Sequence, residues 1–230
     1  MLDCGGQSDD GRVVVRAHGA LPLSPRSAHA PECAAPPSLH VVHTAPRFEL
    51  RAAERAVGDL LRALGQDPAS EHLVDTPRRV GAAYAEMLTP REFSLTTFPN
   101  DEGYDELVIA RDIPLHSLCQ HHLLPFTGLA HVGYLPGERI LGLSKLARVV
   151  EMFARGLQVQ ERLTKRVADW LQDQLQPKGV GAVIEAEHLC MSLRGVQARG
   201  CRTVTSALHG LLRDDPRSRG EFFALAGVRP

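Results

Sequence analysis

The sequence has few cysteines, almost no net charge and no long run of apolar residues. Its 230 residues include five widely separated cysteines, a sparse and odd-numbered set unlike that of a small secreted disulfide protein. We therefore expect a reducing, cytoplasmic compartment. A formal net charge of −1 argues against nucleic acid as a partner, because binding a phosphate backbone needs a basic face. No apolar run approaches the ~18–20 residues of a membrane-spanning helix, so we expect no membrane partner.

Residues 1–46 differ in composition from the rest of the chain. They contain six prolines and four glycines but no lysine and no aromatic residue. Such a segment cannot bury enough apolar surface to offset the conformational entropy that folding removes. We predict a disordered leader over 1–46. The alternative is a metal-binding or regulatory tail that uses its four histidines.

The next region, residues 47–105, is predicted to be helical at first. Apolar residues recur at spacings of three and four between Phe48 and Leu64, and Gly65 follows as a helix C-cap. A second helix is expected to begin at Asp75-Thr76-Pro77, where a capping residue precedes a proline in the first turn. Residues 91–105 are expected to form a loop.

Residues 106–230 form the third predicted region, in which strand-like and helical patterns follow one another. Strands are expected over Glu106–Ile113, Leu123–Leu135, Gly181–Leu193 and Cys201–Leu212. Helices are expected from a cap at Ser144, from about Val159 to Leu175, and over Glu221–Leu225. Two strands, two helices and two strands predict an α+β fold with a mostly antiparallel sheet and helices on one face.

One short motif suggests a metal ion. Cys119 and His122 are three residues apart in Cys119-Gln120-His121-His122, close enough for one turn of chain to direct both at the same ion. Thiolate sulfur and imidazole nitrogen together suit zinc. A lone motif of this kind is a weak signal, and a buried cysteine beside solvent-facing histidines is the alternative.

A second motif supplies another cysteine and another histidine. His188 and Cys190 are two residues apart in a predicted strand, so their side chains are expected to share a face. With Cys119 and His122, Cys190 would complete three zinc ligands and leave a fourth position for water, as in catalytic sites. His121 and His188 would then remain free for proton transfer near neutral pH. Alternatively, Cys190 is a core residue.

A basic stretch suggests an anion site. Between Arg139 and Arg166 there are seven lysine and arginine residues against two acids. Ser144 offers a hydroxyl and a backbone N–H at a helix start, and Lys145 and Arg148 share one face of that helix. Together they could bind a phosphate chain, although a solvated charged helix would look the same. Gln160 and Glu161 follow, and a carboxylate there could accept two N–H bonds from a purine edge.

Taken in order, these motifs resemble the GTP cyclohydrolase I family over roughly residues 50–226. The segments that carry the resemblance are TPRRV at 76–80, CQHH at 119–122, GLSKLAR at 142–148, QVQERL at 158–163, EHLC at 187–190 and Arg194-Gly195. The resemblance implies a tunnelling fold: an antiparallel four-stranded sheet with two helices on one face, preceded by N-terminal helices. It also implies a homo-oligomer, a decamer of two pentameric rings with sites between subunits.

The resemblance also implies residue roles. Cys119, His122 and Cys190 match the zinc ligands, and His121 and His188 match the histidines that move protons. The substrate contacts match Ser144, Lys145, Arg148 and Arg194 for the triphosphate and ribose, Arg79 from a neighbouring subunit, and Gln160 and Glu161 for guanine. One position departs from the family pattern, because Gln120 stands where a glutamate is usual. Rate or pH dependence could therefore differ.

The activity that the resemblance implies is zinc-dependent hydrolysis and rearrangement of GTP. The products are 7,8-dihydroneopterin triphosphate and formate, and the step is the first of folate and tetrahydropterin biosynthesis. Which histidine performs which proton transfer stays open.

Two alternatives to this function remain. One is an altered enzyme acting on another nucleotide or a later pterin, motivated by Gln120. The other is a non-enzymatic zinc-stabilised assembly protein, which would need His188 as a fourth ligand.

Overall fold

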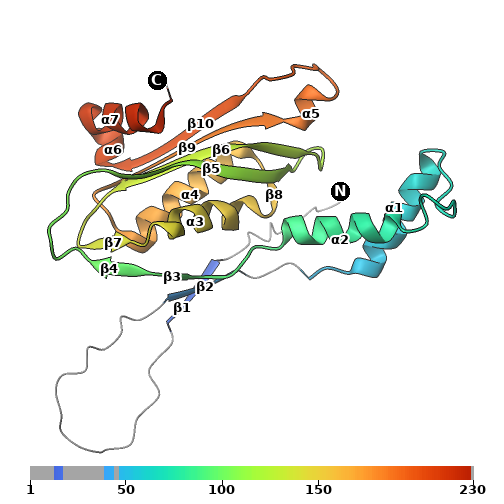
Figure 1. Cartoon of the computed structure of the whole chain (residues 1–230), viewed down its shortest axis with the longest axis horizontal. Coiled ribbons are helices and arrows are strands. Elements are labelled where there is room, and N and C mark those ends of the chain that lie inside the picture. Colours follow the sequence, from blue (N-terminus) through green and yellow to red (C-terminus); the bar gives the residue numbers. More distant parts are fainter. Residues whose placement is uncertain (1–12, 18–38, 44–46, 229–230) are drawn as a thin grey trace, which may run out of the picture.

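A five-stranded sheet lies at the centre of the molecule. The computed structural model describes residues 13–17, 39–43 and 47–228. Four long strands run antiparallel to their neighbours in the order β10-β9-β6-β5, and short β8 lies parallel to β5 at the edge. They are β5 (Val108–Cys119), β6 (Pro125–Leu135), β8 (Leu157–Gln158), β9 (Gly179–His188) and β10 (Thr203–Gly210). The α+β prediction is confirmed, and the sheet is visibly curled (Figure 1).

Two helices cover one face of this sheet. These are α3 (Ser144–Ala154) and α4 (Gln160–Leu175), and both bury an apolar stripe in the main core. Val149, Leu163 and Phe126 are fully buried there. Each such side chain contributes about 1.5–3 kcal/mol by leaving water, so Leu163→Ala should cost about 2–5 kcal/mol. Packing of this kind holds the sheet ends and α4 in fixed positions.

Two further helices lie against part of the opposite face, so helices are not confined to one side. They are α6 (Leu211–Asp214) and α7 (Pro216–Ala226), and α7 is longer than the predicted Glu221–Leu225. Phe222 of α7 packs directly over Gly181 of β9, where an added Cβ would come within 2.7 Å of the phenyl ring. A second small core forms at this contact, with Leu107, Leu135, Val183 and Leu212.

The N-terminal helices form a hairpin that projects from the sheet (Figure 1). They are α1 (Leu50–Ala63) and α2 (Thr76–Leu88), which pack on each other. Asp75 occupies the N-cap position of α2 as predicted, but its side chain makes no cap bond. Its carboxylate accepts a hydrogen bond from Arg79 instead, at 3.0 Å.

Within the described ranges, no helix is both long and apolar enough to cross a membrane.

The structure differs from the predicted elements in two connecting segments. The predicted loop 91–105 contains β3 (Phe93–Leu95) and β4 (Thr97–Pro99), and β4 pairs with β7 (Arg139–Leu141), which sequence analysis did not predict. The predicted strand 181–193 ends at His188, where the chain turns into the one-turn helix α5 (Leu189–Ser192). The strands β3, β4 and β7 have three residues each. Such short strands depend on a partner strand rather than on their own pattern, so the periodicity of the sequence did not reveal them.

Part of the predicted leader also has regular structure. Strands β1 (Val13–Ala17) and β2 (Leu39–His43) pair antiparallel, and β2 pairs with β3. The prediction of disorder is therefore not met at these residues, whose runs of valine favour extended backbone. The rest of the predicted leader lies outside the described residues.

Candidate functional site

The turn between β5 and β6 carries the first half of the site. Cys119 is the last residue of β5, and its backbone N–H donates to the Leu124 carbonyl at 2.8 Å. The Leu123 N–H closes the turn by donating to the Cys119 carbonyl at 2.9 Å. Leu123 has a φ of +55°, a left-handed conformation that a leucine rarely adopts. This tight turn displays His121 and His122 on the surface.

Two side chains from distant elements hold this turn in place. The Tyr84 hydroxyl of α2 donates to the Leu123 carbonyl at 3.0 Å. From the other side, the Arg162 guanidinium donates to Gln120 Oε1 at 2.7 Å and to the Leu157 carbonyl at 2.9 Å. Sequence analysis did not identify Tyr84 or Arg162, because no pattern in the sequence shows where their polar ends lie.

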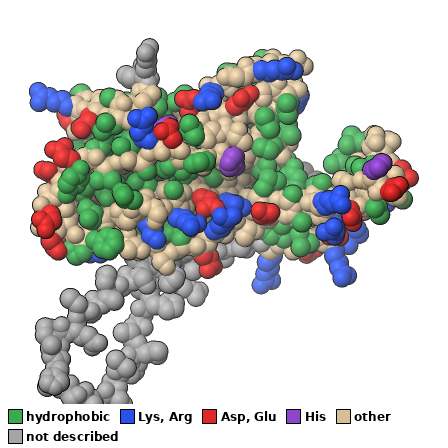
Figure 2. Space-filling view, in the orientation of Figure 1, with side chains coloured by type: hydrophobic (Ala, Val, Ile, Leu, Met, Phe, Trp, Pro, Cys, Tyr) green, Lys and Arg blue, Asp and Glu red, His purple; other side chains and the backbone are tan. Residues whose placement is uncertain are grey.

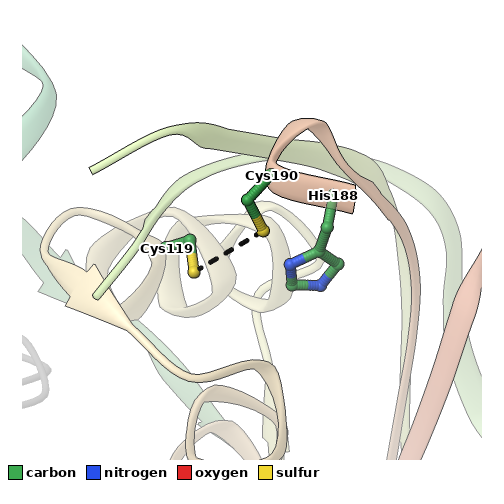
Figure 3. A group of neighbouring side chains, drawn as sticks. All are labelled: Cys119, His188 and Cys190. Carbon is green, nitrogen blue, oxygen red and sulfur yellow. Dashed lines mark hydrogen bonds between the residues drawn. The ribbon is translucent and has the colours of Figure 1, made fainter. Parts of the chain in front are cut away.

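The second half of the site comes from the end of β9. After His188 the backbone enters α5, which turns Cys190 back toward Cys119, so that the two sulfur atoms lie 4.0 Å apart. Both cysteines are buried, at 5% and 8% exposure. Figure 3 shows the two sulfurs facing each other with the His188 ring beside them. His188 and Cys190 thus lie in one group with Cys119, as the sequence led us to expect, and a helical turn rather than strand alternation places Cys190 there.

The cysteine pair fits a zinc ion. The sulfurs are free thiols, and two thiolates ~2.3 Å from one tetrahedral zinc would lie roughly 3.8 Å apart, close to the 4.0 Å found here. Burial and the neighbouring Cys119 both raise the pKa of the Cys190 thiol. A cation between the sulfurs would offset that cost, because coordination favours the thiolate. The sulfur and imidazole donors match zinc better than magnesium or calcium.

The third ligand position has two candidates. Among the described residues, His188 is the histidine whose ring nitrogen lies within 4.8 Å of both sulfurs. The predicted ligand, His122, places Nδ1 3.9 Å from Cys119 Sγ, and His121 places Nδ1 3.8 Å from the same atom. Both of these rings are exposed on the turn. The structure thus places the other four predicted metal and proton-transfer residues near Cys119, but only His188 and Cys190 form one close group with it.

His188 lies in a partly buried setting of its own. Its ring stacks on Phe126 with centroids 4.5 Å apart and an interplanar angle of 9°. Burial lowers the pKa of His188 below its ordinary value, and the Glu161 carboxylate acts in the opposite direction. The net direction favours a neutral imidazole at pH 7.

Gln160 and Glu161 are adjacent in sequence but lie in different environments. Gln160 is 2% exposed, and its amide oxygen lies 2.7 Å from His188 Nε2. Glu161 is exposed, and its carboxylate is close enough to act on His188. The exposed Arg194 is also nearby, since its charge lowers the pKa of Cys190. Glu161 and Arg194 therefore border the cysteine pair on the solvent side.

The remaining predicted substrate contacts lie away from the cysteine pair in this chain. Ser144, Lys145 and Arg148 stand at the start of α3, where Leu143, not Ser144, is the N-cap residue. The other end of this 11-residue helix leads to β8, next to Cys119. A helix of that length spans about 15 Å. In the described part of the chain, no hydrogen bond or ion pair joins these three residues to the cysteine pair.

Arg79 is also separate from the cysteine pair. It is exposed on α2, where it pairs with Asp75. Figure 2 shows several basic side chains, with acidic ones among them, on the part of the surface that α1 and α2 form. One chain therefore assembles the buried part of the predicted site but leaves its phosphate-binding part dispersed.

Comparison with known proteins identifies the family. A model of the family GTP cyclohydrolase I matches residues 53–227. The chain is 53% identical over 174 residues to GTP cyclohydrolase 1 of Synechococcus sp. (strain JA-2-3B'a(2-13)), covering 74% of this chain and 76% of that protein. The identity is 51% over 172 residues with the Aquifex aeolicus protein (75% and 94% covered) and 48% over 174 residues with the Rattus norvegicus protein (74% and 72%).

A solved structure, archaeosine synthase QueF-Like in the apo form, matches 45% of this chain and 93% of its own at 16% identity, with a TM-score of 0.37. That likeness is too slight to support an argument. The family model and the identities to curated enzymes agree with each other over most of the chain. The chain belongs to the GTP cyclohydrolase I family.

Proposed function

We propose that this protein is a zinc-dependent GTP cyclohydrolase I that converts GTP to 7,8-dihydroneopterin triphosphate and formate, the first step of pterin and folate biosynthesis. The observation that carries the proposal is the buried Cys119–Cys190 pair with histidines beside it, in a chain of this family. A non-enzymatic zinc protein is not retained, because the relatives that match most of the chain are enzymes.

Cys119 and Cys190 would hold the metal, with His122 as the third ligand and His188 as the alternative. When bound, zinc supplies Lewis acidity, which makes water a nucleophile at neutral pH. The short turn after β5 and the helical turn α5 keep the two thiols at the separation that zinc needs. These ligands stay attached to rigid strand ends, so substrate binding would not have to assemble the metal site.

Glu161 would recognise the base. Its exposed carboxylate beside His188 can accept hydrogen bonds from N1–H and the 2-amino group of guanine. Adenine offers an acceptor at N1 and lacks the 2-amino group, so bound ATP would cover the carboxylate, exclude water from it and leave it without a hydrogen-bond donor. A site that hydrogen-bonds its substrate in this way rejects an analogue without the donors by as much as ~10⁴.

His188 and His121 would move the protons of ring opening. A neutral His188, which its burial favours, can take up a proton at a ring nitrogen and deliver it to the purine imidazole. His121 is exposed on the turn and can exchange protons with solvent. Both rings lie near Cys119 Sγ, so either could exchange a proton with a substrate bound there.

The triphosphate would be bound by Lys145, Arg148 and Arg194, with Ser144 at the helix start and Arg79 from a neighbouring subunit. A homo-oligomer would bring the two parts together, because Ser144, Lys145 and Arg148 lie in the first half of α3, whereas the end of that helix leads to β8 next to Cys119. The edge strand β10 also has exposed residues, such as Val204, and closing several sheets into a ring would leave no such edge unpaired. We propose the tunnelling fold and a decamer of two pentamers on this basis.

A direct assay tests the proposed function. Purified, reduced protein is incubated with GTP, and formate and the pterin product are quantified together. We expect equal amounts of both from GTP and neither from ATP. Formate from ATP at a comparable rate, or no product from GTP in zinc-loaded protein, would contradict the proposal and favour another nucleotide or a later pterin as substrate.

A further inference from the structure

Gln160 is a buried polar residue whose side chain contacts His188. It is the first residue of α4, and it is 2% exposed. Its amide nitrogen donates toward the Ile184 carbonyl at 3.1 Å, the Thr203 carbonyl at 2.9 Å and Thr205 Oγ1 at 3.1 Å. An amide group has only two N–H donors, so these acceptors use all of them.

These contacts determine which way the Gln160 amide faces. Backbone carbonyls only accept hydrogen bonds, so the nitrogen must face Ile184 and Thr203. The amide oxygen then faces His188 Nε2, 2.7 Å away. An amide oxygen only accepts as well, so His188 Nε2 must carry the hydrogen. In the neutral ring, Nδ1 is then the nitrogen with the free lone pair. Figure 3 shows this nitrogen on the side of the ring that faces the sulfurs.

The acceptors of the Gln160 amide and the ring of Phe126 keep this arrangement rigid. In the described part of the chain, Thr164 Oγ1 hydrogen-bonds only with the Gln160 backbone carbonyl, to which it donates at 2.9 Å, and with Thr205 Oγ1, 2.6 Å away, so it does not orient the amide itself. On the other side, Phe126 stacks on the His188 ring and limits its rotation. The amide of Gln160 is therefore fixed before the substrate arrives. Neither of its N–H groups remains to donate a hydrogen bond to a purine base.

We infer that Gln160 is a positioning residue, which holds His188 in the Nε2–H form with Nδ1 directed at the cysteine pair, rather than a residue that reads guanine. The inference rests on the proposed function only in that His188 acts on GTP. It replaces the role that the sequence resemblance implied for Gln160, whereas Glu161, exposed and next to it, keeps the base-reading role.

The two roles predict different kinetics. A guanine-reading residue contributes to substrate binding, so its loss should raise KM for GTP. A residue that orients His188 contributes to the chemical step, so its loss should lower kcat. Partners that orient active-site ligands are typically worth ~10–100-fold. We therefore expect Gln160→Met, which has a similar length but no amide, to lower kcat by ~10–100-fold with KM for GTP little changed.

Thr164→Val is the matched control. It removes a hydroxyl from the same buried network but leaves the Gln160–His188 contact in place, so kcat should stay close to that of the native protein. Gln160→Glu is the conservative variant, because it retains an oxygen acceptor for His188 Nε2. Its protonated form also supplies an O–H donor for the Ile184 or Thr203 carbonyl, so it should restore part of the lost kcat. If the Met variant does not fold, the protonation of His188 in the native protein, described next, tests the inference.

A spectroscopic measurement shows which ring nitrogen of His188 carries the hydrogen, and it does not require turnover. Solid-state ¹⁵N spectra of the full chain labelled with ¹⁵N-histidine report which ring nitrogen is protonated, and the His188 signals are those lost in His188→Asn. We expect Nε2–H and unprotonated Nδ1 in the native protein and in Thr164→Val, and loss of this preference in Gln160→Met.

Three results would overturn the inference: protonated Nδ1 with bare Nε2 in native His188, a rise in KM with unchanged kcat in Gln160→Met, or an equal loss of kcat in Thr164→Val. The nitrogen spectra do not depend on the reaction. Suppose that GTP yields no formate, while the spectra show that native His188 carries its hydrogen on Nε2 and that Gln160→Met abolishes this preference. In that case the proposed function fails, but the positioning role of Gln160 stands.

Discussion

The buried and the exposed parts of the candidate site are built in different ways. Cys119, Cys190, His188 and Gln160 lie at strand ends and at the start of α4, and each is held by the main core or by hydrogen bonds within it. The predicted phosphate contacts lie on helix surfaces, where Arg148 pairs with Glu151 and Arg79 with Asp75. A single chain therefore gathers the proposed metal ligands, whereas the proposed phosphate site would depend on surfaces that another copy brings together.

This difference also predicts which substitutions matter most. Residues of the buried part have fixed geometry, so removing one should abolish a function outright. Residues of the exposed part act through screened charges in water, so each should contribute a smaller share of binding. The following experiments test that ranking.

The largest effect is expected for Cys190→Ser. A serine hydroxyl is a poor ligand for zinc compared with a thiolate, so the variant should lose both bound zinc and at least ~10³-fold in turnover. Elemental analysis of reduced protein and the formate assay measure both. Cys201→Ser is the control, because Cys201 is a free, exposed cysteine and its variant should keep zinc and activity. Full zinc content in Cys190→Ser would remove this residue from the ligand set.

The next largest effect is expected for Glu161→Gln. An amide can no longer accept both N–H bonds of guanine, so kcat/KM for GTP should fall by ~10²–10⁴ while zinc content stays unchanged. Asp173→Asn, an exposed carboxylate on the same helix, should leave kcat/KM unaltered. Native kinetics in Glu161→Gln would show that another residue recognises the base.

A smaller effect is expected for Lys145→Ala and Arg148→Ala. Each removes one charge from the triphosphate site, so KM for GTP should rise by roughly 10-fold and the rise should depend on salt. Zinc content should not change. A KM that stays the same at low ionic strength would place the triphosphate elsewhere.

Mixed oligomers sharpen the comparison between the two parts. A Lys145→Ala, Arg148→Ala chain keeps the metal centre, and a Cys190→Ser chain keeps the phosphate residues. If sites combine the two parts from neighbouring copies, oligomers that contain both chains should regain turnover that neither parent has. Co-expression with two affinity tags and purification on both isolates them. Activity no higher than that of the parents would mean that each chain builds its own complete site.

The smallest effect is expected for Tyr84→Phe. The change removes the hydroxyl that donates to the Leu123 carbonyl, a bond worth about 0.5–1.5 kcal/mol, and relaxes the turn that displays His121 and His122. Unfolding free energy should fall by about that amount, with a loss of kcat below ~10-fold. Tyr104→Phe, at an exposed tyrosine, should change neither quantity. Equal effects of both substitutions would show that Tyr84 does not support the turn.

The sequence by itself determined the main elements and most residues of the site. The apolar spacing of α3 and α4 identifies the faces that they bury, and the strand and helix order identifies the α+β class. Such features are visible because helices and strands have fixed periods of 3.6 and 2 residues. The cysteine and histidine motifs are likewise visible, because zinc accepts only a few ligand types.

Only the tertiary structure decided which of these residues meet. Cys119 and Cys190 are 71 positions apart and come within 4.0 Å because β5, β6 and β9 are neighbours in the sheet. Gln160 and Glu161 are adjacent, yet one faces β9 and β10 while the other faces solvent. Motifs record residue types and local spacing, whereas contact and burial depend on how whole elements pack. The cluster of cysteine and histidine side chains was therefore predictable from the sequence, and the contact between Gln160 and His188 was not.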